Sequence, residues 1–85
     1  MSKLSTFEEI IRIWKINKLK EVTLFGVTLN IENNRFYGKE KDIEMIYKEK
    51  KYVLLKKGKA QLKINLKNID DVLIWILVYM FFREL

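Results

Sequence analysis

The feature that most constrains this fold is an unbroken apolar run near the C-terminus. Residues 72–82, VLIWILVYMFF, follow Asp70 and Asp71 without a polar break. Acidic residues before the run and Arg83 after it suit the dipole of a helix, and Asn68 is the predicted N-cap. β-branched residues at alternate positions leave a buried strand as the alternative. The run is shorter than the roughly 20 residues that cross a bilayer, so protein has to cover it.

A helix that is apolar on every side needs cover on every side. In a chain of 85 residues, one sheet face and one other helix leave part of it in water. A second copy of the chain is the simplest partner for such a patch, and the predicted homodimer interface consists of Trp75, Tyr79, Phe81 and Phe82. One tight core is the alternative. Membrane docking is disfavoured, because the run lacks the lysine-rich polar face of interfacial helices, so we expect no membrane partner.

The N-terminal residues predict an amphipathic helix that ends near residues 17–20. Ser5 or Thr6 is the expected N-cap, and Ser5 with Glu8 has the spacing of a capping box. The apolar face recurs at helical spacing in Phe7, Ile10, Ile11 and Trp14.

From Glu21 onward, apolar residues alternate with polar ones, which predicts strands. Three pairs of residues interrupt the alternation. Phe25-Gly26 is predicted to be a bulge or a tight turn, and Asn33-Asn34 and Lys57-Gly58 are predicted to be turns. Short turns favour an antiparallel meander. The expected fold is a single α+β domain over residues 1–85: N-terminal helix, antiparallel four- or five-stranded meander and long apolar C-terminal helix, with both helices on one sheet face.

The composition leaves few groups for catalysis. The chain has neither cysteine nor histidine, and its three glycines are far apart, so thiol chemistry, histidine bases and phosphate loops are excluded. Glu40, Asp42 and Glu44 could hold a divalent cation if they share one strand face, although such residues more often pair with lysines across a sheet. We expect no enzyme, no cofactor and no metal.

The N-terminus has acidic residues where a signal peptide would be apolar, so we expect no secretion. The predicted location is intracellular: the cytoplasm, of an infected host cell if the chain is viral. The abundance of Lys, Ile and Glu resembles the composition of hyperthermophile proteins and of small proteins of archaea and their viruses.

The positive charge is concentrated in the middle of the chain. Residues 39–67 hold ten lysines and four acidic residues, a net of +6, whereas residues 68–85 hold one arginine and three acidic residues, a net of −2. Basic and aromatic side chains on an open sheet face suit single-stranded nucleic acid, because lysines meet phosphates and rings stack on bases. The predicted contacts are Arg35, Tyr37, Lys39, Lys56, Lys57, Lys59, Lys63 and Lys67, and Tyr52 is a further candidate. The alternative is a solvated surface, since lysines also guard strand edges.

A meander followed by a C-terminal helix is similar in element order to the positive-cofactor and Whirly-type single-stranded DNA binders. The resemblance covers roughly residues 22–82, and KKGKAQLKINL resembles the last strand of that family. It implies dimerisation through the C-terminal helix and binding of nucleic acid on the sheet, and it assigns no individual residue.

The predicted function is that of a small non-enzymatic binding protein, a homodimer that contacts DNA or RNA, preferably single-stranded. The alternative is a protein-interaction module, such as a viral or host-directed inhibitor, that binds another protein by a sheet edge or apolar surface.

Overall fold

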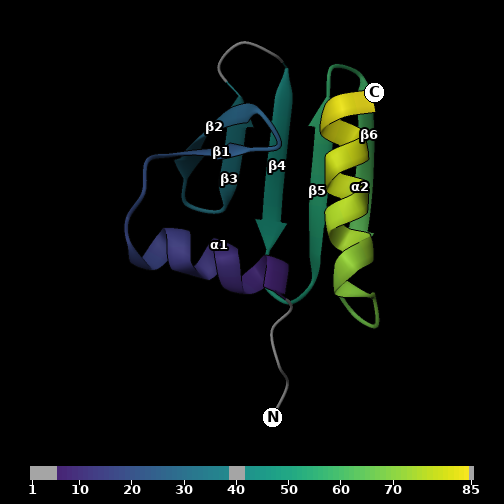
Figure 1. Cartoon of the computed structure of the whole chain (residues 1–85), viewed down its shortest axis with the longest axis horizontal. Coiled ribbons are helices and arrows are strands. Elements are labelled where there is room, and N and C mark those ends of the chain that lie inside the picture. The colour runs from purple at the N-terminus through teal and green to yellow at the C-terminus, as the bar shows by residue number, and fades with distance from the viewer. Residues whose placement is uncertain (1–5, 39–41, 85) are drawn as a thin grey trace.

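The computed structural model describes residues 6–38 and 42–84, which form an α+β fold of two helices and six strands (Figure 1). The order of the elements is as predicted, but the sheet has six strands, not four or five. The elements are α1 (Thr6–Ile16), β1 (Glu21–Leu24), β2 (Val27–Glu32), β3 (Arg35–Gly38), β4 (Ile43–Lys48), β5 (Tyr52–Lys57), β6 (Ala60–Asn65) and α2 (Asp71–Glu84).

The six strands form one antiparallel meander in which each strand pairs with the next along the chain. Tight turns make this possible. Leu24 pairs with Val27, so Phe25 and Gly26 alone connect β1 to β2, with φ of 52° and 80°. Two successive positive φ values are typical of the type I′ hairpin turn, whose twist matches that of the strands. The pair is therefore a tight turn and not a bulge.

The other described hairpins also contain a residue in the left-handed region. Asn33, Lys50 and Gly58 have φ of 56°, 59° and 60° in the turns that follow β2, β4 and β5. Asparagine and glycine accept this conformation readily. The Asn33-Asn34 turn lies where it was predicted, whereas the β5–β6 turn consists of Gly58 and Lys59, one residue later than predicted, because Lys57 pairs with Ala60.

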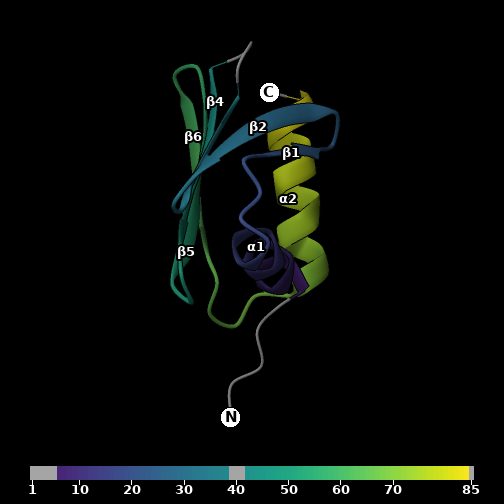
Figure 2. The ribbon, with the colours of Figure 1, turned by 90° about the vertical axis from the view of Figure 1, so that its left-hand side faces the viewer.

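Alternation along each strand gives the sheet two different faces. Met45 and Leu55 pair in register with each other, and Leu62 follows them on the same face. This inner face carries the core, together with the buried side chains of both helices. Figure 2 shows the two helices on one side of the sheet, as predicted, with the other side left open.

The sheet is strongly curved, and the β1–β2 hairpin bends across the helix side towards α2 (Figure 2). At its tip, the Phe25 ring contacts Trp75 and Tyr79 edge-on, with centroid distances of 5.9 and 5.2 Å. Trp75 also meets Phe7 of α1 at 5.0 Å. The first hairpin therefore closes the core over α2.

The N-cap of α2 is Asp70, which corrects the expectation of Asn68. The Asp70 carboxylate accepts a 2.8 Å hydrogen bond from the Val72 N–H, as an N-cap side chain does. Asn68 instead has a φ of 58° in the preceding loop. At the other end of α2, Lys57 donates a 3.1 Å hydrogen bond to the Phe82 carbonyl, where positive charge suits the helix dipole. In residues 6–38 and 42–84, neither helix combines the length and the apolar character that a membrane crossing requires.

Candidate functional site

The uncovered side of the sheet presents a continuous surface on strands β3 to β6, which we call the open face. Its side chains follow from the registers of the three strand pairs. The open face consists of Arg35, Tyr37, Glu44, Ile46, Lys48, Tyr52, Leu54, Lys56, Gln61, Lys63 and Asn65.

One row across the open face has apolar residues in the middle and cations at both ends. Arg35 pairs with Ile46, Ile46 with Leu54, and Leu54 with Lys63. Ile46 and Leu54 are partly buried, whereas Arg35 and Lys63 are exposed. This row combines an apolar platform with flanking positive charge.

Two tyrosine rings lie beside this row, and each one holds a cation. The Arg35 guanidinium is 4.9 Å from the centre of the Tyr37 ring, and the Lys63 ammonium is 4.4 Å from the centre of the Tyr52 ring. Both distances are within the range of cation–π attraction. Each ring therefore combines a stacking surface with a positive charge.

Glu44 is the acidic residue within this surface. It forms an ion pair with Arg35, and this hydrogen bond and charge raise the pKa of the guanidinium above its ordinary value. Glu44 also pairs in register with Lys56. Since Lys48 and Lys63 add two further cations, the open face keeps an excess of positive charge.

Four of the predicted nucleic-acid contacts lie on the open face as expected: Arg35, Tyr37, Lys56 and Lys63. Lys59 lies in the β5–β6 turn and Lys67 follows β6, and both are exposed at the rim. Lys39 lies outside the described residues.

The prediction that Lys57 contacts nucleic acid has to be corrected, because Lys57 does not lie on the open face. It follows Val53 and Leu55 on the inner side of β5, because neighbouring residues of a strand point to opposite faces, and it binds the C-terminal end of α2. Lys48, Ile46 and Leu54 were missed by the sequence analysis. Their alternation with buried Met45 and Val53 was the available signal.

The candidate cation ligands Asp42 and Glu44 do not form a metal site. Among residues 6–38 and 42–84, no group of three or more acidic side chains is placed to hold an ion. Glu44 pairs with Arg35, and Asp42 is exposed before β4. Glu40 lies outside the described residues.

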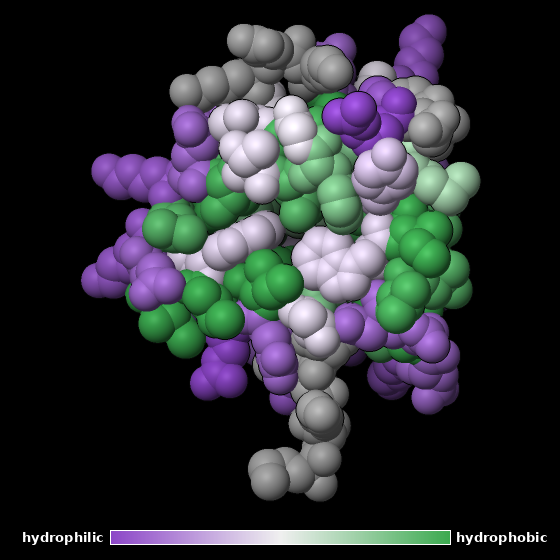
Figure 3. All heavy atoms as spheres, viewed as in Figure 1, coloured by the Kyte–Doolittle hydropathy of each residue, from purple (hydrophilic) through white to green (hydrophobic). Residues whose placement is uncertain are grey.

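A second surface lies on the helix side. One side of α2 leaves apolar residues in water; we call it the α2 stripe, and it consists of Val72, Leu73, Ile76, Tyr79 and Met80. Figure 3, viewed from this side, shows hydrophobic side chains over α1 and α2 with hydrophilic ones around them.

The four residues of the predicted dimer interface divide between the core and the surface. Phe81 and Phe82 are only 2% and 1% exposed, because the single chain already covers them. They are core residues, and their assignment to the interface is corrected. Trp75 is partly buried against Phe7 and Phe25. Tyr79 is 44% exposed and belongs to the α2 stripe.

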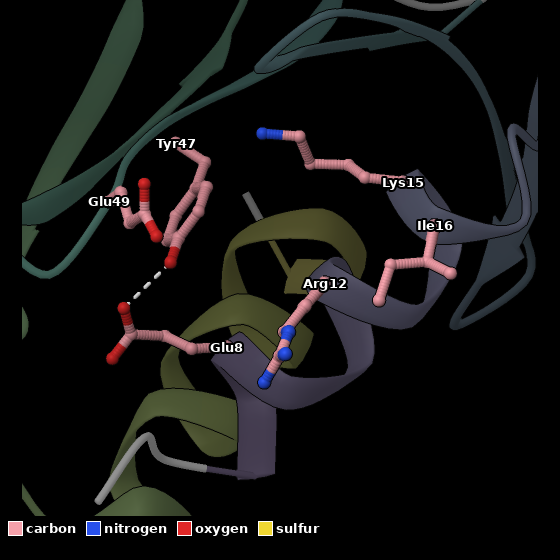
Figure 4. Close-up of a pocket in the computed structure, with 6 residues that line it drawn as sticks. All are labelled: Glu8, Arg12, Lys15, Ile16, Tyr47 and Glu49. Carbon is pink, nitrogen blue, oxygen red and sulfur yellow. Dashed lines mark hydrogen bonds between the residues drawn. The ribbon is translucent and has the colours of Figure 1, made fainter.

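A pocket of about 270 Å³ opens between α1 and the end of β4 (Figure 4). Its lining combines two acids, two cations, a phenol and one aliphatic side chain: Glu8, Arg12, Lys15, Ile16, Tyr47 and Glu49. The Glu8 carboxylate accepts hydrogen bonds from the Tyr47 hydroxyl at 2.7 Å and from the Lys50 N–H at 3.0 Å. Burial raises the pKa of the Tyr47 phenol, and so does the Glu8 carboxylate that it faces. The phenol is therefore held neutral, in a structural hydrogen bond between helix and sheet.

Comparisons with protein-family models, curated proteins and solved structures find no match for this chain.

Proposed function

We propose that the chain is a non-enzymatic protein that binds single-stranded nucleic acid on the open face. The observation that carries this proposal is the arrangement of two tyrosine rings, each with its own cation, around the apolar pair of Ile46 and Leu54. Flat rings next to lysines are what single-strand binding requires, because every base has a π-face and every nucleotide a phosphate.

The binding mode follows from the positions of the side chains. A base that stacks on Tyr52 takes over the ring surface, and Lys63 turns from the ring to the neighbouring phosphate. On β3 the Tyr37 ring offers a second stacking surface, while Arg35 stays in its ion pair with Glu44. Tyr37 and Tyr52 lie two strands apart across the sheet and four residues apart along it, so their backbone positions are about 16 Å apart. A run of several nucleotides is needed to reach both.

A second candidate is a protein-interaction module, which the exposed apolar residues of α2 and the single-sided pairing of β6 favour. An edge strand offers unpaired backbone groups to a strand of another protein. Binding of a protein partner would depend little on salt, and oligonucleotides would not compete with it. Binding of nucleic acid at the open face is sensitive both to salt and to competing oligonucleotides.

The experiment is a fluorescence-anisotropy titration of a labelled single-stranded oligonucleotide and of its duplex at low salt. Lys56→Glu and Lys63→Glu should weaken binding to both, and Tyr52→Ala and Tyr37→Ala should each cost about 1–3 kcal/mol on the single strand, with a smaller loss on the duplex. The control is Lys20→Glu, an equal charge reversal at an exposed site between α1 and β1. If the wild type binds no better than a neutral protein at low salt, the open face is a solvated surface.

A further inference from the structure

The α2 stripe is arranged symmetrically about Ile76. Leu73 and Tyr79 lie three residues before and after it, and Val72 and Met80 lie four residues before and after it. We infer that a second copy of the chain covers this stripe, with the two α2 helices antiparallel across a twofold axis at Ile76. This inference does not rest on nucleic-acid binding.

Helix geometry places the whole stripe on one side of α2. With 3.6 residues per turn, residues three and four apart from Ile76 lie within about 60° of its direction. Ile74 and Val78, two residues away on either side, point into the core and are fully buried. In the antiparallel pair, Ile76 meets its own copy, and Val72 lies against the partner's Met80.

The exposed area is large enough to require an explanation. Val72 is 64% exposed and the other four residues of the stripe are 44–49% exposed. Five large side chains in that state make a contiguous patch of several hundred Å², the size at which a patch on a monomer is usually functional. Ile13 and Ile16 of α1 are also 53% and 64% exposed.

Charge favours a second copy of this chain over another apolar partner. The α2 stripe contains no charged residue, and its two ends differ in charge: Asp70 and Asp71 make the N-terminal end −2, whereas Arg83 and Glu84 cancel at the C-terminal end. Antiparallel pairing sets each acidic N-terminal end against the neutral C-terminal end of the partner helix, where Arg83 also donates a 3.4 Å hydrogen bond to the Phe25 carbonyl of its own chain. Parallel pairing would instead set the aspartates of the two chains together at one end.

The net charge opposes self-association less at α2 than at the strands. The whole chain carries +6, but residues 68–85 carry one arginine and three acidic residues, a net of −2. Two copies that meet through α2 keep their lysine-rich strands apart. The resulting dimer has the layers sheet, helices, helices, sheet, with the two open faces on opposite outer surfaces.

Light scattering after gel filtration tests the dimer. The wild type should have twice the 10.3 kDa mass of the chain, and Ile76→Asp should be monomeric with an unchanged circular dichroism spectrum. Gln61→Asp is the matched control on the open face and should stay dimeric. A wild type that is monomeric at the highest concentration reached, or a dimer that survives in Ile76→Asp, overturns the inference.

Cysteine cross-linking tests the antiparallel geometry and covers the case in which Ile76→Asp fails to fold. The chain has no native cysteine, so each introduced thiol has no competitor. On mild oxidation, Ile76→Cys should form a covalent dimer, and Val72→Cys should do so only when mixed with Met80→Cys. Gln61→Cys is the negative control. A Val72→Cys chain that couples with itself as readily as with Met80→Cys contradicts the twofold axis at Ile76.

Discussion

The Tyr47 hydroxyl donates a 2.7 Å hydrogen bond to the Glu8 carboxylate and so links the end of β4 to the first turn of α1. Glu8 is a buried charged residue, only 6% exposed. Its carboxylate accepts a second hydrogen bond, from the Lys50 N–H, at 3.0 Å. A buried carboxylate needs such donors, because leaving a charge unsatisfied in the interior is costly. The pair therefore sets the position of α1 on the sheet.

Replacement of Tyr47 by phenylalanine should destabilise the protein by about 1.5–3 kcal/mol, because it removes a hydrogen bond to a buried charged group. Urea denaturation followed by circular dichroism measures this loss. Tyr52→Phe, on the open face, is the control and should change stability little. Equal stability of Tyr47→Phe and wild type would mean that the hydrogen bond does not hold α1 in place.

Stability should fall at alkaline pH, partly through Tyr47. Burial and the Glu8 carboxylate raise the pKa of this phenol above its ordinary value of 10.0 in the folded state. The unfolded chain then releases the proton first, so the stabilisation is complete below pH 10 and is lost as pH rises above it. Urea midpoints measured on both sides of pH 10 should fall more steeply for wild type than for Tyr47→Phe. Parallel curves would contradict this.

The N-cap of α2 gives a separate prediction. Asp70→Ala should cost about 1 kcal/mol, because the Val72 N–H loses its 2.8 Å acceptor, whereas Asp70→Asn keeps an acceptor and should cost much less. Thermal unfolding of both variants tests this, with Asp42→Ala as a control for removal of an exposed carboxylate. If Asp70→Asn is as unstable as Asp70→Ala, charge rather than capping is responsible.

The affinity for single-stranded oligonucleotides should decrease steeply with salt. Each phosphate contact contributes a slope of about −0.7 in log affinity against log salt concentration, so Lys48, Lys56 and Lys63 together should give roughly −2. Lys63→Glu should make this slope shallower, whereas Lys20→Glu should leave it unchanged. A slope near zero would mean that phosphates do not meet these lysines.

Much of the fold could be predicted from the sequence because most inner-facing strand residues alternate with polar ones, as Leu62 and Ile64 of β6 do. The number of strands was wrong because Phe25-Gly26 could be a bulge within one strand or a turn between two, and only the turn separates β1 from β2. The conformation of Phe25 could not be predicted either. A bulky residue with a φ of 52° is unusual, and only its contacts with α2 account for it.

The candidate site was predicted less completely. Strand alternation places Lys56 and Lys63 on the open face. It also places Lys57 on the opposite face from Lys56, so the prediction of Lys57 as a nucleic-acid contact was wrong. For α2, an unbroken apolar run has no period, so the sequence cannot tell which side is buried. The packing of α1, β5 and Phe25 against α2 decides it, and Phe81 and Phe82 lie in the core.

The central claim is that the open face of β3 to β6 is the nucleic-acid surface, and amide chemical-shift mapping tests it most directly. A short single-stranded oligonucleotide, titrated into ¹⁵N-labelled protein at low salt, should shift the amides around Tyr37, Tyr52, Leu54 and Lys63 and leave those of α2 unchanged. Saturation of these shifts with added oligonucleotide is the predicted result. No shift at low salt, or shifts confined to α1 and α2, would contradict the account.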